Sequence, residues 1–368
     1  MEVKIVIITL HRVFNYGSIL QAYATQKVFE KNGCKVEIVD YITEQRTNRK
    51  LFLELPDNIV DNHASKSIYI FLRFFSVLIK KLIFGSFLRK HCNLTSQRYI
   101  TSEDIIKNPP EADIYVTGSD QVWNSKYNEG IDKGFFLEFA PKDKIKISFA
   151  SSFGKSQLDE NERNTIKEYL GRYNAISVRE DDARQIIREM GYNSEWIIDP
   201  TLQLKKEEWL GIASPRLVKE RYLILMLLYN EDNGATEYAR EIADKKGLKL
   251  IKLSWELIKP HKVDRLLTHR SPQDFLSLFF YADFVVTNSF HGLAFSINFN
   301  RQFVMVPRNE FNSRIESLLR LTGLENRLVN TTEQAIQVSK EIIDYNMVNK
   351  KIEMERTKAN EFVERIIV

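Results

Sequence analysis

Cysteine is scarce in this chain. The 368 residues include only Cys34 and Cys92, and their spacing matches no metal-binding motif. Small secreted proteins held together by disulfides carry many more cysteines, so the composition excludes that class. The N-terminus enters a predicted strand directly, without the charged and apolar regions of a signal peptide. We therefore expect a cytoplasmic protein with reduced thiols.

Other common signals are also missing. The six histidines form no pair at metal-ligand spacing, and the sequence contains no Walker loop and no GxGxxG fingerprint. We therefore expect no metal site and no bound cofactor. The 53 basic and 49 acidic residues give a net charge of +4, which is too small to indicate a nucleic-acid partner. The hydrophobic content of 43% is ordinary for a globular protein, and the length allows two domains.

What is present is a regular alternation of predicted strands and helices. Strand 3–10, helix 18–32 and strand 35–40 form the minimal unit of a parallel sheet. A second alternation runs from residue 222 to residue 307 and indicates another doubly wound parallel sheet. The fold class is therefore α/β, with two Rossmann-like domains.

One stretch near the C-terminus carries the strongest sign of a functional site. Residues 284–286 read as a buried strand, and the next three residues are small and polar. His291 and Gly292 then lead into a helix that we predict at residues 293–299. In open α/β sheets, ligands bind at the carboxyl ends of strands, where helix N-termini attract anions. A histidine there can exchange a proton near neutral pH, although His291 could instead cap the helix or fill a polar pocket.

Two other strand ends repeat this layout. The apolar strand 113–117 runs into the polar segment 118–124, with the sequence GSDQVWN. The loop after the first strand holds Asn15 and Gly17, and Gly17 would let the backbone approach a ligand closely. Both loops could also be plain turns. Polar strand ends in both halves of the chain indicate two lobes that face one cleft.

Short motifs follow one another along nearly the whole chain. They are Ile7 to Leu10, Asn15 to Ala24, Gly118 to Asn124, Ser177 to Glu180, Asp199 to Leu202, Ser289 to Gly292 and Ser313 to Ile315. In this order they resemble the motifs of the polysaccharide pyruvyl transferase family. The resemblance implies an enzyme that transfers the pyruvyl group of phosphoenolpyruvate to sugar hydroxyls and forms a ketal. It also implies a two-lobed, GT-B-like fold.

The expected domains follow from these patterns. We place an N-terminal, acceptor-side domain at residues 1–205, with a helical insertion at about residues 60–100. A C-terminal, donor-side domain covers residues 206–345. By analogy with other two-lobed transferases, we expect the terminal helix at 346–368 to pack back on the first domain.

The resemblance also suggests roles for individual residues. Phosphoenolpyruvate is anionic, so its site should offer guanidinium groups and helix N-termini. The expected catalytic residues are His291 as general acid, Arg179 as anion partner and Asp120 as base. The expected donor-binding residues are Asn15, Gly17, Asn288, Ser289, Gly292, Arg308 and Arg314. The expected acceptor-binding residues are Gly118, Ser119, Gln121, Trp123 and Asn124, since sugars offer hydroxyls to polar groups and apolar faces to rings.

Several of these residues also have a structural interpretation. A tryptophan such as Trp123 is more often buried in a core than used as a sugar platform. Arg308 and Arg314 are equally suited to helix capping or the surface. Several family members carry an arginine two residues before the histidine, where this chain has Ser289. We expect Arg308 or Arg314 to supply the missing charge.

Residues 67–91 are unusually apolar and basic. The apolar runs are too short to span a bilayer, which needs about 20 residues. A helix with basic residues near both ends can lie in a membrane interface, which would place the enzyme at the inner face of the membrane beside a lipid-linked glycan. We favour the alternative of a helix hairpin packed on the domain or against another subunit, because soluble proteins routinely bury apolar helix faces.

Two other functions stay open at this point. A glycosyltransferase of the same two-lobed fold would use a nucleotide sugar and could bind its ribose through Asp199 or Glu180. A glycan-binding relative without catalysis would fit the absence of an arginine at Ser289.

Overall fold

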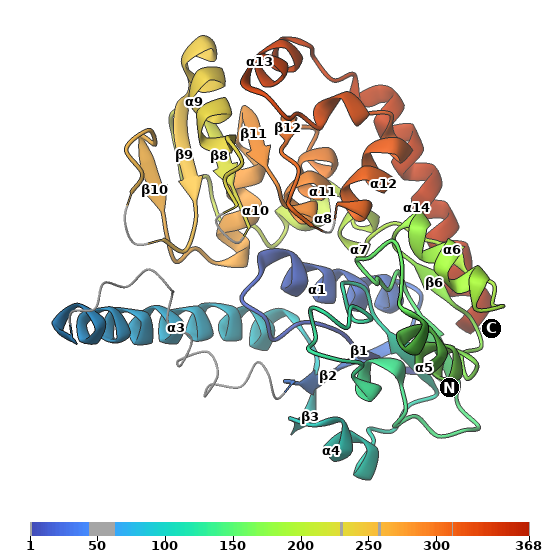
Figure 1. Ribbon diagram of the computed structural model, residues 1–368. Coiled ribbons are helices and arrows are strands. Elements are labelled where there is room, and N and C mark those ends of the chain that lie inside the picture. Colours follow the sequence, from blue (N-terminus) through green and yellow to red (C-terminus); the bar gives the residue numbers. More distant parts are fainter. Residues whose placement is uncertain (1, 44–62, 229–230, 257–258, 311, 368) are drawn as a thin grey trace.

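Two parallel sheets organise the molecule (Figure 1). The computed structural model describes residues 2–43, 63–228, 231–256, 259–310 and 312–367. The first sheet contains β1 (Lys4–Ile8), β2 (Lys35–Tyr41), β3 (Leu94–Tyr99), β4 (Ile114–Thr117) and β5 (Ile145–Ser148). The second contains β8 (Tyr222–Met226), β9 (Lys249–Leu253), β10 (Arg265–Leu267), β11 (Phe284–Thr287) and β12 (Gln302–Met305). Two short strands, β6 (Ser177–Val178) and β7 (Glu195–Trp196), pair separately.

Both sheets have the same strand order. The first runs β3-β2-β1-β4-β5 and the second β10-β9-β8-β11-β12, with every neighbouring pair parallel. Strands with apolar runs lie in the middle, because helices cover both faces of a parallel sheet. All five residues of β8 are buried, for example. The edge strands β3 and β10 are not predicted from sequence, since β3 is mostly exposed and β10 has only three residues.

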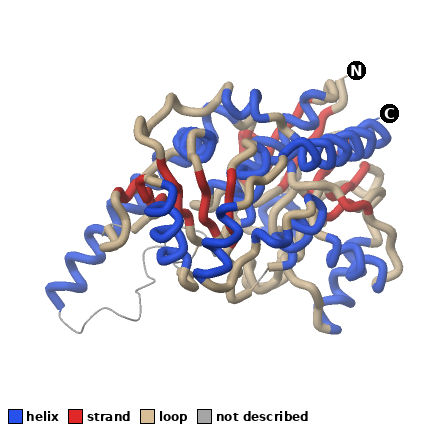
Figure 2. The backbone as a smooth tube through the Cα atoms, turned by 90° about the horizontal axis from the view of Figure 1, so that it is seen from above, coloured by secondary structure: helices blue, strands red, loops and turns tan. Residues whose placement is uncertain are grey.

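Helices connect these strands and cover the sheets (Figure 2). They are α1 (Tyr16–Lys31), α3 (His63–His91), α4 (Ser102–Lys107), α5 (Glu160–Leu170), α6 (Asp181–Glu189), α7 (Pro200–Gln203), α8 (Lys206–Leu210), α9 (Ala235–Lys246), α10 (Pro272–Phe280), α11 (Phe290–Asn298), α12 (Ser313–Thr322), α13 (Thr332–Lys340) and α14 (Tyr345–Ile367). Helix α11 begins three residues earlier than the sequence predicts, because the Ser289 hydroxyl accepts a hydrogen bond from the Gly292 N–H and caps the helix. His291 therefore lies in its first turn.

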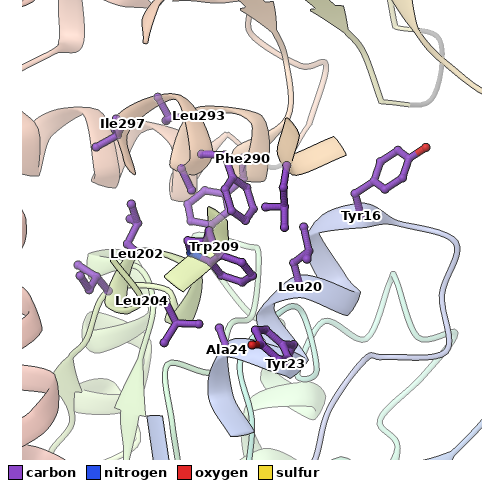
Figure 3. Packing of buried hydrophobic residues seen from close by; sticks show 14 of the residues in the cluster. Tyr16, Leu20, Tyr23, Ala24, Leu202, Leu204, Trp209, Phe290, Leu293 and Ile297 are labelled. Atoms are coloured by element: carbon purple, nitrogen blue, oxygen red, sulfur yellow. The ribbon is translucent and has the colours of Figure 1, made fainter. Parts of the chain in front are cut away.

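The two lobes meet through helices rather than through the sheets. Tyr16 of α1 stacks on Phe275 of α10, with ring centroids 5.0 Å apart. Tyr23 of α1 contacts Trp209 of α8, with ring centroids 5.6 Å apart. Trp209 also contacts Phe295 of α11 at 5.1 Å. Figure 3 shows side chains of this junction, among them Tyr16, Leu20, Tyr23, Ala24, Leu202, Leu204, Trp209, Phe290, Leu293 and Ile297. These residues belong to one buried cluster that includes parts of both lobes.

The terminal helix α14 also links the lobes. It follows the second sheet in sequence, yet Phe362 contacts Phe149 of the first lobe with ring centroids 6.2 Å apart. Arg365 forms an ion pair with Glu195 at 2.5 Å. The helix thus lies along the side of the molecule, from the second lobe to the first (Figure 1).

Helix α3 corrects one sequence prediction. Residues 63–91 form a single helix and not a hairpin, and this helix stands out from the body in both views (Figures 1 and 2). Residues 60–62 of the predicted insertion, and the side chains of residues 63–73, lie outside what the structure describes. Within the described residues, no helix is long and apolar enough to cross a bilayer.

Candidate active site

A polar pocket lies between the lobes, where the carboxyl ends of β1 and β4 face those of β8, β11 and β12. In each sheet this is the point at which the strand order reverses, the place where open α/β sheets bind ligands. The pocket is lined by Asn15, Ser18, Asp120, Gln121, Tyr127, Leu228, Ser289, Phe290, His291, Arg308, Arg314 and Ile315. Seven of these residues were predicted from sequence. The polar strand ends of the two lobes therefore meet at one site, as expected.

Gly17 makes this meeting possible. A Cβ atom on Gly17 would lie 1.9 Å from Nδ1 of His291, a separation that real atoms do not adopt. Glycine was expected to let a ligand approach the backbone, but the group that approaches is the imidazole of the other lobe. Asn15 holds the adjacent backbone, because its side chain accepts a hydrogen bond from the Gly17 N–H. The first turn of α1 is thus shaped to fit His291.

His291 lies beside a buried carboxylate. Its Nε2 is 3.7 Å from Oδ2 of Asp199, which also accepts a hydrogen bond from the Arg179 guanidinium at 2.6 Å. The other oxygen of Asp199 accepts hydrogen bonds from the backbone and hydroxyl of Thr201. Burial alone would raise the pKa of Asp199, but His291, Arg179 and Thr201 hold it well below its usual range. Asp199 is therefore a permanent negative charge behind the histidine.

Asp120 occupies a strained position at the end of β4. Its φ of 72° is in the left-handed region, which costs energy for a residue other than glycine and often marks a functional site. Its carboxylate accepts hydrogen bonds from the Ser18 hydroxyl and from the Gln121 N–H. Burial alone would raise the pKa of Asp120, but surrounding positive charges, Arg179 foremost, lower it. A lowered pKa makes a carboxylate a weaker base, so the role of Asp120 as base stays a prediction.

Arg179 is enclosed by the protein. Its side chain is fully buried and bridges Asp199 and Asp120, with its second nitrogen 3.4 Å from the latter. The guanidinium lies over the Phe290 ring, 4.7 Å from the centroid. Burial alone would lower the pKa of Arg179, but Asp199 and the other carboxylates raise it. Arg179, the expected anion partner, therefore does not line the pocket. It joins Asp199 and Asp120 behind the lining residues instead.

The positive charge of Arg314 is less neutralised by nearby carboxylates than that of Arg179. Arg314 reaches the pocket from the first turn of α12, and its nearest carboxylate oxygen, on Asp120, is 3.9 Å away. Its buried Nε makes no hydrogen bond within the described residues, which is equally true of Nε in Arg179 and Arg308. Burial lowers the pKa of Arg314 to about 10, and the charge of Arg179 adds to this effect. Arg308 also lines the pocket and pairs with Glu231 at 3.3 Å.

Three of the expected donor-binding residues stabilise the backbone at the end of β11. The Asn288 side chain accepts a hydrogen bond from the Leu228 N–H at 2.7 Å and so fastens the end of β8 to β11. Ser289 is the N-cap of α11, and its hydroxyl engages the Gly292 N–H at 3.3 Å. A Cβ on Gly292 would lie 2.6 Å from the Thr287 hydroxyl oxygen. Ser289 still lines the pocket, whereas Asn288 and Gly292 shape the turn behind it.

The predicted acceptor residues separate into two groups. Gln121 lines the pocket, with its side-chain oxygen bonded to the Asn124 amide at 2.7 Å. Trp123 is only 2% exposed and packs on Phe136 in the first-lobe core, so it offers no ring face to a sugar. Gly118, Ser119 and Asn124 are likewise outside the pocket lining, and Ser119 donates to Asp199 at 3.3 Å.

Sequence reasoning missed several residues that build the site. Ser18 binds Asp120, and Phe290 provides the ring against which Arg179 lies. Both belong to the motifs quoted above, which was the available signal. Glu180 is buried, and its pKa is raised by that burial. It accepts hydrogen bonds from the Ser152 hydroxyl and the Phe153 and Gly154 N–H groups, so it organises the loop behind Gln121.

We also expected reduced thiols and no metal site. Cys34 and Cys92 are both free and buried. No group of three or more His, Cys, Asp or Glu side chains with metal-binding geometry occurs among the described residues. What the pocket offers chemically is therefore a histidine, two arginines and hydroxyl and amide groups around one carboxylate.

Comparison with solved structures identifies the fold. The UDP-GlcNAc 2-epimerase from Methanocaldococcus jannaschii, in complex with UDP-GlcNAc and UDP, superposes with a TM-score of 0.51 at 14% identity, covering 94% of each chain. The UDP-GlcNAc 2-epimerase from Neisseria meningitidis, bound to UDP-GlcNAc, gives 0.51 at 11% identity, covering 100% of this chain and 99% of the other. These similarities confirm the GT-B-type fold of two Rossmann-like domains.

Comparison of sequences identifies the family. No curated protein matches the chain. The family model for polysaccharide pyruvyl transferase matches residues 15–310, a range that contains every lining residue of the pocket except Arg314 and Ile315. Since this match covers most of the chain, the protein is a transferase that belongs to the polysaccharide pyruvyl transferase family.

Proposed function

We propose that this protein transfers the pyruvyl group of phosphoenolpyruvate to two hydroxyls of a sugar, in a polysaccharide or its precursor, and forms a pyruvate ketal. The observation that carries the proposal is the buried guanidinium of Arg314. Its nearest carboxylate oxygen, on Asp120, is 3.9 Å away, whereas the other lining arginine, Arg308, already pairs with Glu231. A buried guanidinium without a close counter-charge favours an anionic substrate, and phosphoenolpyruvate carries both a phosphate and a carboxylate.

Arg314 is the proposed anchor for the donor. Its guanidinium is too far from Asp120 for a hydrogen bond, and its burial is only partly offset by negative charge. A phosphate or carboxylate accepting two hydrogen bonds from the guanidinium would supply that charge. Arg314 and Ser289 line the same pocket, so we propose that Arg314 supplies the charge that an arginine at Ser289 would provide in other family members. Arg179 then acts as a positioning residue, because its two terminal nitrogens already bind Asp199 and Asp120.

We propose that His291 donates a proton to the methylene carbon of phosphoenolpyruvate. In the overall reaction this carbon gains one proton and becomes a methyl group. The neighbouring carbon forms bonds to two sugar oxygens and loses its bond to the phosphate oxygen. The second hydroxyl proton leaves with phosphate. Asp199, held ionised beside His291, stabilises the positive charge that the ring carries when it is protonated.

The acceptor side is the first lobe. Ser18 and Gln121 line that wall of the pocket and offer hydrogen bonds to sugar hydroxyls. We propose that the acceptor is a sugar or a lipid-linked glycan, and that the enzyme works in the cytoplasm or at the inner face of the membrane. No resident cofactor is required by this reaction, since phosphoenolpyruvate is a co-substrate.

Phosphate release tests the proposal directly. Purified protein is incubated with phosphoenolpyruvate and a panel of sugars and glycolipids, and inorganic phosphate and the ketal are measured. Arg314→Gln should lower kcat/KM for phosphoenolpyruvate by about 10- to 100-fold, the effect of losing charge-assisted hydrogen bonds. Arg320→Gln is the matched control, because Arg320 is an exposed residue of the same helix.

The outcomes separate the competing functions. Acceptor-dependent phosphate release that Arg314→Gln weakens and Arg320→Gln spares supports the proposal. Transfer from a nucleotide sugar, with no turnover of phosphoenolpyruvate, would replace it with a glycosyltransferase of the same fold. Equal loss in both arginine variants would remove Arg314 from donor binding.

A further inference from the structure

The outer face of α3 is apolar and exposed. Phe74, Leu78 and Leu82 are 47%, 41% and 58% exposed, and Phe75 and Ile79 beside them are 44% and 38% exposed. At the spacing of an α-helix these five residues form one continuous stripe. A soluble protein rarely leaves a contiguous apolar stripe of this kind in water without a function for it.

The opposite face of α3 is already used for packing. Phe84 and Phe87 are buried and contact Tyr16 and Tyr23 of α1, with ring centroids 5.5 and 6.0 Å apart. Toward the second lobe, Ser76 lies 3.2 Å from the His269 ring, and Lys80 lies over the Trp255 ring. The helix is therefore fixed against both lobes, and this fixed orientation turns the stripe outward.

All charged residues of α3 are basic. The 29 residues contain no aspartate and no glutamate, and their basic residues are Lys66, Arg73, Lys80, Lys81, Arg89 and Lys90. Arg89 and Lys90 are exposed in the last turn of the helix. An exposed apolar face on a helix whose charged residues are all basic is the pattern of helices that lie in the plane of an anionic membrane surface.

We propose that α3 docks this protein on an anionic lipid surface, with the stripe from Phe74 to Leu82 inserted at the headgroup level and Arg89 and Lys90 on the lipid phosphates. Pairing of α3 with a second copy is less favourable. Two such helices side by side would bring basic residues together, and the helix has no acidic residue to pair with them.

Docking would place the pocket near the lipid. Phe84 contacts Phe14 and Tyr16, with ring centroids 5.8 and 5.5 Å apart, and these two residues flank Asn15 of the pocket. The C-terminal part of α3 therefore packs against residues adjacent in sequence to the pocket residue Asn15. The inference rests on α3 alone and not on the identity of the donor, so it can fail while the proposed reaction stands.

Vesicle flotation tests the inference. The full chain is floated with phosphatidylcholine vesicles and with vesicles that also contain phosphatidylglycerol, at low and high salt. Binding should require the anionic lipid and should fall as salt rises, because surface charges are screened beyond about 10 Å at 0.1 M. Leu78→Gln with Leu82→Gln should weaken binding by at least about tenfold, since burying each leucine contributes a large apolar area.

Matched variants separate a lipid contact from general effects. Ile342→Gln with Met354→Gln changes two other apolar residues that are exposed, at 84% and 62%, outside α3. These controls should bind vesicles like the unmodified protein, and all variants should keep its melting temperature and its activity on a soluble acceptor.

Charge is tested in the same way. Arg89→Gln with Lys90→Gln should weaken binding by about 25-fold, since each basic residue near an anionic surface contributes about fivefold. Lys245→Gln with Lys246→Gln is the control, because these lysines also occupy the last turn of a helix, α9. The inference is overturned if no vesicle is bound at any salt, or if controls and α3 variants lose binding equally. Sedimentation showing a dimer that Leu78→Gln with Leu82→Gln dissociates would overturn it in favour of self-association.

Discussion

At the scale of single residues, the site depends on contacts between distant parts of the chain. Gly17 and His291 are far apart in sequence, and a side chain as small as a methyl group on Gly17 would collide with the imidazole. Asp199 and Arg179 are fully buried charges that neutralise each other behind that imidazole. The contact of Gly17 with His291 and the ion pair of Asp199 with Arg179 each lead to a testable prediction.

Gly17→Ala should displace His291 and lower kcat by about a hundredfold or more, the usual contribution of a general acid. Gly85→Ala is the control, because Gly85 is also helical but has only an arginine side chain at 3.4 Å from the added carbon. That variant should keep its activity and gain slightly in stability, since alanine favours a helix. Steady-state kinetics with a thermal melt measure both effects. Gly17→Ala with normal kcat would show that His291 needs no such fit.

Asp199→Asn should lower the free energy of unfolding by about 3–5 kcal/mol at pH 7, because Arg179 is left as a buried charge with a partner removed. The pKa of Asp199 is below its unfolded value of about 3.9. Its contribution to stability is therefore complete above about pH 4 and is lost as the pH falls further. The gap between variant and unmodified protein should narrow between about pH 4 and pH 2.

Urea unfolding at several pH values measures this gap. Asp181→Asn is the control, since Asp181 pairs with Arg184 at the surface, where an ion pair contributes about 0–1 kcal/mol. A gap for Asp199→Asn that is small, or that does not change with pH, would contradict the pairing.

At the scale of elements, the N-terminus of helix α11 fixes the position of His291 in the first turn. Ser289 lines the pocket and also caps the helix, so its two roles need to be separated. Helix α10 offers a comparison, because Ser271 caps it in the same way, through the Asp274 N–H.

Ser289→Ala and Ser271→Ala should each lower the free energy of unfolding by about 1 kcal/mol, the usual cost of losing an N-cap. Neither should change KM for phosphoenolpyruvate by more than about twofold. Chemical denaturation and donor saturation curves measure the two quantities. A tenfold rise in KM in Ser289→Ala alone would make Ser289 a donor ligand and not only a cap.

At the scale of the whole molecule, the two lobes share one apolar cluster. Trp209 is completely buried between Tyr23 of the first lobe and Phe295 of the second, and α14 adds a contact between Phe362 and Phe149. An interface of this kind couples the lobes, whereas a small polar interface would let them move and unfold independently.

We therefore expect a single cooperative unfolding transition in calorimetry, with equal calorimetric and van't Hoff enthalpies. Trp209→Ala should destabilise both lobes together, by about 3–5 kcal/mol, because it opens a cavity at their junction. Two separate transitions in the unmodified protein would show that the lobes unfold independently and that the shared cluster does not couple them.

Local sequence by itself determined the class of fold, most of the elements and most of the pocket. Apolar runs such as 284–286 form buried strands wherever they occur, and in a parallel sheet the residues that follow a strand lie at its carboxyl edge. Asn15, Asp120, His291 and Arg314 could be placed at the site for that reason. Motif order was sufficient for the family, which the match over residues 15–310 confirms.

Only the tertiary structure decided what each of these residues does. Arg179, Arg308 and Arg314 all come after predicted strands and are all buried, but the distance to a carboxylate separates a positioning residue from the proposed donor anchor. Trp123 could have faced a sugar and lies in the core. Helix α3 could have been a buried hairpin, and its exposed stripe follows from which face the two lobes already occupy. Such outcomes depend on contacts between residues far apart in the chain, which local pattern does not contain.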